Sequence, residues 1–350
     1  MNREERIKLF HDVFAPKTGE KILFLVDIPR DNIKDTKKWR DRREMAREWY
    51  ITFKELGQKN RFSVRWVEYP ATGLHNTPLH KNIRDLASKN NLVIAITEFS
   101  ATSSLVKIAY AKNSITRCAS MPGVERRMEK SAFKADYSKV KRYADAIKKF
   151  LEAAIGAEVT FSTGDKLYVD LRYRNAKSEA GECTKVGQFI NLPSGEGWKA
   201  PYEATSEEIG KFGESKTEGI IPFIYNGELV KHVVKNNRMV EVIGKGKNAE
   251  ARRNFLAEND SRRNIAEFAI GCNPQAVVTG NILEDEKSSG LHIGYAMSNQ
   301  LGGKVESDMH DDLVFTEGCP VEATTVTLIN KDGSKTNLIK DSKLRYDLLK

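Results

Sequence analysis

The sequence predicts an α/β protein with two parts, an N-terminal α/β domain that resembles a doubly wound sheet and a β-rich α+β domain. Two observations support this fold class. Apolar runs alternate with amphipathic helical stretches in the first part of the chain, whereas short β-type runs separated by Gly and Asn turns fill the rest. The pattern of predicted helices and strands changes near residue 156, so we expect one domain over residues 1–156 and a second over residues 157–350.

The first part contains long apolar runs of the kind found in buried strands. Strands are predicted at residues 21–29, 62–69 and 91–99. Helices are predicted where charged and apolar residues alternate with a helical period, up to about residue 57 and at residues 79–89, 103–112 and 137–155. Because helices separate the strands, the sheet is expected to be mostly parallel.

The second part contains shorter strands that are joined by tight turns. The predicted strands lie at residues 158–162, 166–173, 219–225, 228–235, 239–243 and 323–329. Asn226-Gly227 and Asp332-Gly333 are turn dipeptides typical of hairpins. A sheet built from such hairpins is antiparallel.

The composition limits the compartment and the class of protein. The charged start of the sequence leads into no apolar stretch, and no window approaches the length of a membrane span, so we expect a cytoplasmic protein with no membrane partner. The four cysteines show no Cys-x-x-Cys spacing. This pattern fits a reducing compartment and argues against a disulfide framework or a thiolate zinc site.

The formal charge of +9 raises the question of an anionic partner. The most basic stretch, residues 37–43, is followed by Glu44 and Glu48 at spacings that suit helical ion pairs, which favours a solvated helix face. Gly244-Lys-Gly-Lys is better explained as a turn than as a phosphate loop. We therefore expect neither a nucleic-acid partner nor a nucleotide cofactor.

Two of the six histidines, His292 and His310, lie among carboxylates. His310 and Asp312 are two residues apart, so on a strand both side chains point to the same face and could chelate one ion, while Asp311 points away. Glu267 lies on an apolar strand over residues 264–271, on the same face as its neighbours at positions 265 and 269. A carboxylate on such a strand needs a partner.

Glu286 and His292 are six residues apart, so they can meet only if the turn at residues 288–290 brings them together. With Glu267, His310 and Asp312 they would form a set of carboxylates and imidazoles suited to two divalent ions that share a bridging carboxylate. Two simpler interpretations stay open. Acidic runs often coat a surface, and an isolated His-x-Asp pair is often only a hydrogen bond.

The same segments resemble the thermophilic metallo-aminopeptidases, the aminopeptidase T-like family that includes leucyl aminopeptidases. The resemblance rests on the strand around Glu267, the Asp-Glu pair followed by a His-containing turn, the late His-x-Asp, and the stretch at residues 189–201, Phe-Ile-Asn-Leu-Pro-Ser-Gly-Glu-Gly-Trp-Lys-Ala-Pro. It covers about a fifth of the chain. It implies a metal-dependent aminopeptidase that hydrolyses the N-terminal residue of peptides.

The resemblance also implies a set of metal ligands, which are Glu267, Glu286, His292, His310 and Asp312. Glu267 and Glu286 would assist the attacking water as catalytic residues, and two ions of zinc, cobalt or manganese are expected. The substrate would be a peptide or small molecule with a free amino group, and the chain would form a homodimer.

One departure from the family concerns a tyrosine, which members place about seven residues after the first ligand histidine. This chain has Asn299 there and Tyr295 nearby, so Tyr295 is a candidate for substrate binding. Glu196 is a second candidate, because it could attract the substrate's ammonium group. It could also cap the backbone amides of the turn at residues 193–195, and we favour this structural role.

Two other functions stay open. The superfamily includes iron-dependent ring-opening dioxygenases of dihydroxypyridines, and His292, His310 and Asp312 could supply the two histidines and one carboxylate that Fe(II) oxygen chemistry needs. These relatives carry histidine where this chain has Glu267, which favours hydrolysis. A non-catalytic member that binds a small molecule is the third possibility.

Overall fold

The computed structural model describes residues 1–350. The chain forms two compact units. The first comprises Met1–Lys141, Gly181–Ser194 and Gln275–Glu284, and the second comprises Arg142–Ala180, Gly195–Pro274 and Asp285–Lys350. Each unit is therefore built from three separate segments of the chain. The division into domains over residues 1–156 and 157–350 stays a prediction.

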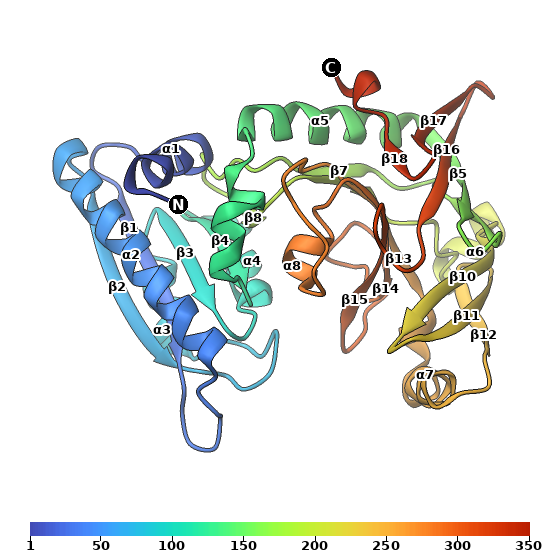
Figure 1. Cartoon of the computed structure of the whole chain (residues 1–350), viewed down its shortest axis with the longest axis horizontal. Coiled ribbons are helices and arrows are strands. Elements are labelled where there is room, and N and C mark those ends of the chain that lie inside the picture. The colour runs from blue at the N-terminus through green and yellow to red at the C-terminus, as the bar shows by residue number, and fades with distance from the viewer. The chain divides into compact units, whose positions relative to one another are not determined.

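The first unit is built on a parallel sheet of five strands in the order β2-β1-β3-β4-β8 (Figure 1). The strands are β1 (Lys21–Ile28), β2 (Ser63–Pro70), β3 (Leu92–Thr97), β4 (Arg117–Pro122) and β8 (Phe189–Asn191). The helices are α1 (Arg3–Phe14), α2 (Lys37–Asn60), α3 (Lys81–Ala87) and α4 (Thr102–Ala109), with 3-10 turns η1 (Arg126–Lys130) and η2 (Ala132–Lys134). The parallel sheet with crossover helices confirms this part of the predicted fold class.

Strand β1 is buried on both faces because helices cover both sides of the sheet. Ile22, Phe24 and Val26 pack in one core with residues of α1 and α2. Leu23 and Leu25 pack in a second core with residues of α3 and α4. The uninterrupted apolar run that predicts this strand is thus the signature of a doubly covered parallel sheet.

A buried carboxylate lies at the carboxyl ends of β1 and β3. Asp27 is fully buried and accepts hydrogen bonds from the backbone N–H groups of Glu98 (2.8 Å) and Phe99 (2.9 Å) and from the indole N–H of Trp39 (3.0 Å). In doubly wound sheets, this crevice at the carboxyl ends of the strands commonly binds ligands. Here a side chain of the protein already accepts hydrogen bonds from these donors.

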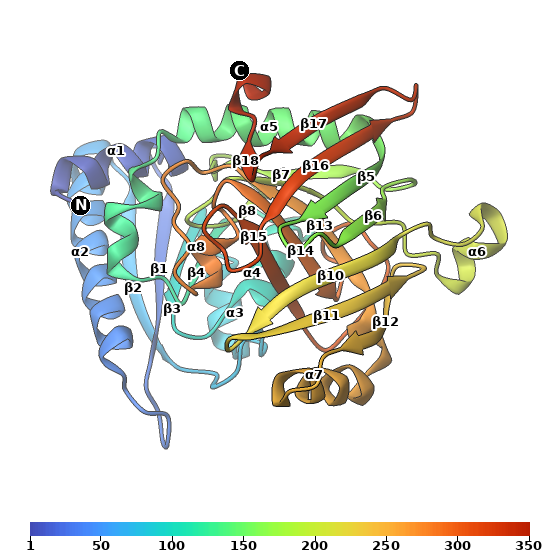
Figure 2. The same ribbon diagram turned by 45° about the vertical axis from the view of Figure 1, so that its right-hand side comes forward.

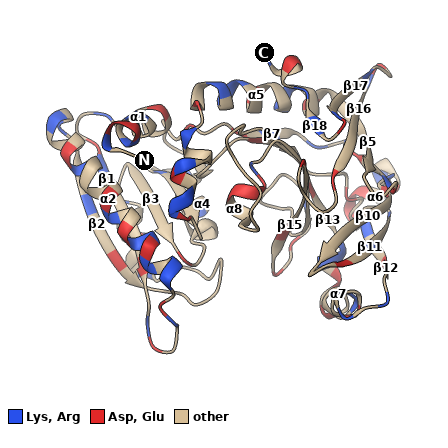
Figure 3. Ribbon diagram, viewed as in Figure 1, with Lys and Arg blue, Asp and Glu red and all other residues tan.

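Helix α2 carries both signs of charge along its length (Figure 3). Its arginines pair outside the helix rather than with Glu44. Arg40 and Arg43 contact Asp35, at 3.6 and 2.9 Å, just before the helix begins. Arg42 turns inward and pairs with Glu98. The arginines of the basic stretch are thus engaged in ion pairs within the chain.

Two antiparallel sheets make up the second unit (Figure 2). The larger has the order β12-β11-β10-β6-β5-β16-β17-β18, and its strands are β5 (Ala154–Phe161), β6 (Lys166–Asp170), β10 (Glu218–Tyr225), β11 (Glu228–Lys235), β12 (Arg238–Ile243), β16 (Ala323–Asn330), β17 (Lys335–Lys340) and β18 (Lys343–Leu344). The smaller has the order β15-β14-β13-β9-β7, and its strands are β7 (Ala176–Glu179), β9 (Glu196–Lys199), β13 (Ile265–Gly271), β14 (Gly290–Ala296) and β15 (His310–Thr316). This β-rich part confirms the rest of the predicted fold class.

One core joins the elements of the second unit. It contains apolar side chains from both sheets and from three helices. The helical elements assigned to this unit or ending in it are α5 (Tyr137–Ala153), α6 (Ser206–Phe212), α7 (Lys247–Glu258), η3 (Asp260–Arg263), α8 (Ile282–Asp285) and η4 (Tyr346–Leu349). The helices of the whole chain are all too short or too polar to cross a membrane.

We predict that His232 makes the fold sensitive to acid. This fully buried side chain lies on β11, and burial lowers its pKa from 6.5 to about 4. The folded protein keeps the ring neutral while the unfolded chain takes up a proton below pH 6.5, so stability should fall by about 3 kcal/mol between pH 6.5 and 4. His232→Leu should remove most of this fall, as measured by urea unfolding across that range. The same change at the exposed His11 should leave the pH profile unchanged, and an unchanged profile in His232→Leu would contradict the assignment.

Candidate metal centre

One face of the sheet β15-β14-β13-β9-β7, which we call the charged face, carries the polar groups of the candidate site. They come from four strands and are His310 and Asp312 on β15, His292 on β14, Glu267 on β13 and Glu196 on β9. The alternate residues of these strands, such as Phe268, Ile293 and Leu313, pack in the apolar core on the opposite face. Because side chains alternate along each strand, the polar groups lie on one face of the sheet and the apolar core lies on the other.

A β-bulge aims Glu267 at the charged face. Ile265 pairs with Tyr295, but Glu267 pairs with Gly294, so the register between β13 and β14 shifts between Ile265 and Glu267. Simple alternation would place Ile265 and Glu267 on one face, as the sequence predicts. The bulge instead turns Ile265 into the core, while Glu267 faces the histidines. Bulges next to functional sites commonly re-aim a side chain in this way.

Gly294 provides the space in which these side chains meet. It lies on β14 and pairs with Asp312 of β15 and Glu267 of β13. A Cβ atom at this position would lie 2.6 Å from Cε1 of His310, 2.8 Å from Cβ of Glu267 and 2.9 Å from Oδ1 of Asp312. Only a residue without a side chain allows the three groups to approach each other.

His310 lies between two carboxylates. Its Nε2 is 3.3 Å from Oε2 of Glu267 and 3.3 Å from Oδ1 of Asp312. Its Nδ1 donates to the carbonyl oxygen of Met297 at 2.8 Å, because that oxygen can only accept. The backbone thus fixes the ring, and in the neutral tautomer the lone pair of Nε2 points at the carboxylates. Such an arrangement is typical of a histidine that ligates a metal ion.

His292 presents one nitrogen to a carboxylate and leaves the other without a partner. Its Nε2 is 3.3 Å from Oε2 of Glu196, whereas its Nδ1 is buried and forms no hydrogen bond. A buried polar atom without a partner is costly. Ligand atoms of His292, Glu267 and Asp312 all lie within 4.8 Å of one another. The donor set therefore fits a divalent metal ion.

The carboxylates of the site need positive charge beside them, either from protonated histidines or from a metal ion. Burial lowers the pKa of His310 but Asp312 and Glu267 raise it, and the net pKa lies well above its usual value. Burial likewise opposes the charge of His292, while Glu196 raises its pKa to about 9. Without a metal, protons on the two rings neutralise the carboxylates. Metal binding would displace these protons, so it should strengthen as the pH rises.

The two carboxylates of this group differ in their tendency to ionise. Burial raises the pKa of Asp312 but contact with His310 outweighs it, and the net pKa is about 2. Burial raises the pKa of Glu267 more than His310 lowers it. Paired groups whose environments push their pKa values apart commonly take different chemical roles.

Lys287 forms a second assembly of charge on the same side of the sheet. Its side chain is 1% exposed, and its ammonium lies 2.6 Å from Oε1 of Glu196, 2.9 Å from Oε1 of Glu286 and 3.0 Å from Oε2 of Glu179. These three carboxylates hold the pKa of Lys287 well above its usual value against the effect of burial. One ammonium thus supplies the positive charge that a second metal ion would bring.

The structure brings together four of the five predicted ligands, Glu267, His292, His310 and Asp312. Ligand atoms of Glu267, His292 and Asp312 form one group, and His310 contacts two of these residues, Glu267 and Asp312. The fifth, Glu286, pairs with Lys287. Burial raises the pKa of Glu286 to about 8, although Lys287 opposes this rise. Its predicted role as a ligand stays a prediction that this contact does not favour.

The two candidates for substrate binding lie in different places. Glu196 is on the charged face, where it contacts both Lys287 and His292. Its roles in substrate binding and in capping the turn stay predictions. Tyr295 is 1% exposed in the core of the second unit, and its hydroxyl donates to Asp311 at 2.8 Å. Its side chain therefore points to the opposite face from the ligands.

Lys287 and Gly294 belong to the site in the structure, but they were not predicted from the sequence. Lys287 follows an acidic run and precedes a turn, a context that resembles a solvated surface, so nothing in the sequence marks it as buried. Gly294 carries a readable signal. It lies two residues after His292 within a strand, and a glycine inside a strand often marks the close approach of other groups.

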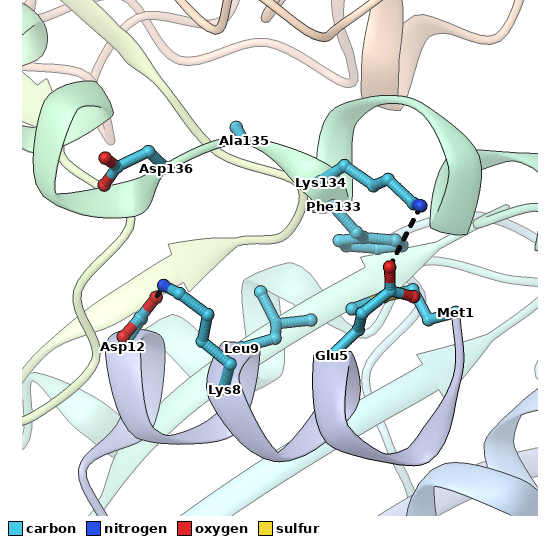
Figure 4. A pocket seen from close by; sticks show the side chains of 9 residues that line it. All are labelled: Met1, Glu5, Lys8, Leu9, Asp12, Phe133, Lys134, Ala135 and Asp136. Carbon is cyan, nitrogen blue, oxygen red and sulfur yellow. Dashed lines mark hydrogen bonds and ion pairs between the residues drawn. The ribbon is translucent and has the colours of Figure 1, made fainter.

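A pocket of about 220 Å³ lies in the first unit between α1 and residues 133–136 (Figure 4). Four of its five charged side chains pair with each other. Lys134 contacts Glu5 at 3.0 Å, and Lys8 pairs with Asp12. No histidine or cysteine lines it, so its chemistry offers nothing comparable to the charged face.

Comparisons with known proteins identify the fold. No protein-family model matches the chain, and no curated protein matches it. Among solved structures, the chain is similar to the 2,5-dihydroxypyridine dioxygenase from Pseudomonas putida KT2440. The TM-score is 0.68 with 15% sequence identity, and the match covers 98% of both chains. The two proteins therefore share one fold over their whole length.

This match corrects the predicted family. The expected membership of the thermophilic metallo-aminopeptidases was wrong, because the full-length structural match is to a dioxygenase and no family model supports an aminopeptidase. The prediction of a peptide-cleaving hydrolase or metalloprotease was wrong for the same reason. The predicted divalent metal keeps its support in the group of Glu267, His292 and Asp312.

We predict that Gly294→Ala prevents metal binding. The added methyl group would collide with His310, Glu267 and Asp312, all closer than 3.0 Å. Because such contacts force these groups apart, ferrous or zinc affinity should fall by roughly 100-fold or more, which isothermal titration calorimetry can measure. Gly210→Ala, in open space on α6, is the matched control. Normal affinity in Gly294→Ala would contradict this account of the site.

A second prediction concerns Lys287. Lys287→Met would leave Glu179, Glu196 and Glu286 without the ammonium that now neutralises them. Removing one partner of a buried ion pair costs about 3–5 kcal/mol, and we expect a loss of this size in chemical denaturation. Lys335→Met breaks the exposed pair with Glu158 and should cost less than about 1 kcal/mol. Equal losses in the two variants would refute the assignment.

Proposed function

We propose that the chain is a dioxygenase that uses one ferrous ion to open a hydroxylated aromatic or heteroaromatic ring. The observation that carries the proposal is the position of Asp312 between two histidines. Its Oδ1 lies 3.3 Å from Nε2 of His310, and its carboxylate lies within 4.8 Å of a ligand nitrogen of His292. Two histidines and one carboxylate are the ligand set that non-haem Fe(II) oxygenases use. The fold shared with a 2,5-dihydroxypyridine dioxygenase supports the same class of reaction by analogy.

The ligands follow from the environments of the side chains. His310 is held through Nδ1 by the carbonyl of Met297, which leaves Nε2 for the metal. His292 offers a buried nitrogen that has no other partner. Asp312, with its pKa lowered to about 2, is the carboxylate that stays ionised. A bound ferrous ion would supply the redox chemistry with dioxygen at this place.

Glu267 has a separate role in this proposal. Its Oε2 lies 3.3 Å from His310, but burial raises its pKa, so the carboxylate accepts a proton more readily than Asp312. We assign it as the base that takes the proton of a substrate hydroxyl. A general base works best when its pKa is raised towards the working pH.

One ion per chain follows from the second charge assembly. Glu196 and Glu286 would have to join a second ion, but both are committed to Lys287, at 2.6 and 2.9 Å. A further divalent ion at this place would be repelled by the ammonium. The expectation of two ions is therefore replaced in this proposal by a single ion with a lysine beside it.

The test is oxygen uptake by protein that is stripped of metal and refilled with Fe(II) under anaerobic conditions. We expect dioxygen consumption and loss of ring absorbance with dihydroxylated rings such as 2,5-dihydroxypyridine. His310→Ala should lower both the iron content and the rate by at least about 100-fold, because it removes a ligand. His80→Ala changes a histidine of the first unit and should leave both unchanged.

Two results would refute the proposal. One is the absence of oxygen uptake with every dihydroxylated ring while iron is bound. The other is an unchanged rate in His310→Ala.

A further inference from the structure

The charged face continues beyond the proposed metal ligands to the edge of the sheet. Along one row of the register, Val314 of β15 pairs with His292, His292 with Ala269, Ala269 with Trp198 of β9, and Trp198 with Lys177 of β7. Paired residues of neighbouring strands point to the same face. Trp198 and Lys177 therefore lie on the side of the sheet that carries the metal ligands.

Burial of the opposite face supports this placement. Ser178, next to Lys177, contacts Asp145 of α5 at 3.3 Å, and a side chain at Gly197, next to Trp198, would collide with Ile147 of the same helix. Helix α5 therefore covers the other face of β7 and β9. Lys177 and Trp198 point away from it and are both partly exposed.

Lys177 is a cation without an acidic partner. It forms no ion pair, and its ammonium only reaches the carbonyl oxygen of Gln300 at 3.4 Å. Lys287, on the same side of the sheet, is by contrast surrounded by three carboxylates. Burial lowers the pKa of Lys177 and the charge of Glu267 opposes this, so the ammonium lies within electrostatic range of that carboxylate on the charged face. A half-buried ammonium with spare donors is suited to an anionic ligand.

Trp198 lies between this ammonium and the ligands. Its indole N–H donates to the carbonyl oxygen of Leu301 at 3.2 Å, which fixes the orientation of the ring. Ala269, the next residue in the row, contributes only a methyl group. His292, a proposed metal ligand, lies on β14, three strands away from β7 and roughly 14 Å across the sheet. The side chains of Lys177 and His292 span part of this distance, so a single substituted ring alongside the indole can bridge the rest.

We infer that Lys177 and Trp198 select a substrate whose ring carries an anionic substituent, such as a carboxylate, on the side opposite the metal-binding hydroxyls. This inference rests on the proposed function, since it takes the metal ligands as the place where the hydroxyls bind. Lys177 binds the anionic oxygen, and Trp198 packs against the ring. Lys177 is a specificity residue in this assignment and takes no part in the oxygen chemistry.

Two probes separate the contribution of the anion from that of the metal. 3,4-Dihydroxybenzoate and 4-methylcatechol share the metal-binding diol and are similar in size, but only the first carries a negative charge on the far side of the ring. Binding is measured by titration calorimetry on the zinc-loaded protein, which does not turn over. We expect the wild-type protein to prefer the carboxylate by about tenfold or more, the size of a charge-assisted hydrogen bond.

Lys177→Met should reduce this preference to about one while leaving the affinity for 4-methylcatechol and for zinc unchanged. Lys177→Arg should keep it, because the charge remains. Lys331→Met changes the same charge in the exposed turn between β16 and β17 and should behave as the wild type. Trp198→Ala should weaken both probes by similar factors, since stacking does not depend on the carboxylate.

Three results would overturn the inference. They are a wild-type protein with no preference for the carboxylate, a preference that survives in Lys177→Met, and a loss of zinc affinity in Lys177→Met, which would make Lys177 a part of the metal site. Failure of the proposed function has a different signature. In that case the iron-loaded protein consumes no oxygen, although the preference for the anionic probe on zinc-loaded protein persists.

Discussion

Compensation of buried charge is the constraint on which the second unit depends. Its small sheet holds Glu267, Asp312 and Glu196 on one face, where the side chain of each is at most 9% exposed. Ionised groups cannot be kept there without partners, because desolvation costs several kcal/mol for each ion. Lys287 meets this requirement for one set of carboxylates. His292 and His310 supply the positive charge for Glu267 and Asp312, and these two rings can exchange their protons for a metal ion.

Local backbone features make this compensation possible. The bulge between Ile265 and Glu267 turns one side chain to the core and the other to the ligands. Gly294 leaves the volume in which three strands bring their groups together. The contact between His310 and the carbonyl of Met297 then fixes the imidazole. These backbone features thus hold the side chains of the site in place.

The fold class could be predicted because long apolar runs and short alternating strands differ in period and in length. His310 and Asp312 could also be paired, since alternation in a regular strand is reliable. Alternation gave the wrong face for Ile265, because a bulge leaves no clear mark in the sequence. The partner of Glu286 is its own neighbour Lys287, and spacing alone cannot distinguish a buried ion pair from a ligand. The family assignment failed because short motifs covered only a fifth of the chain, whereas the structural match covers 98% of it.

The most direct test of the central claim is X-ray absorption at the iron edge, on protein loaded with Fe(II) and analysed for metal content. The account predicts one iron per chain, bound by nitrogen and oxygen atoms with the outer-shell scattering of two imidazole rings. A chain that takes up no iron, or an iron whose surroundings lack imidazole, would contradict it.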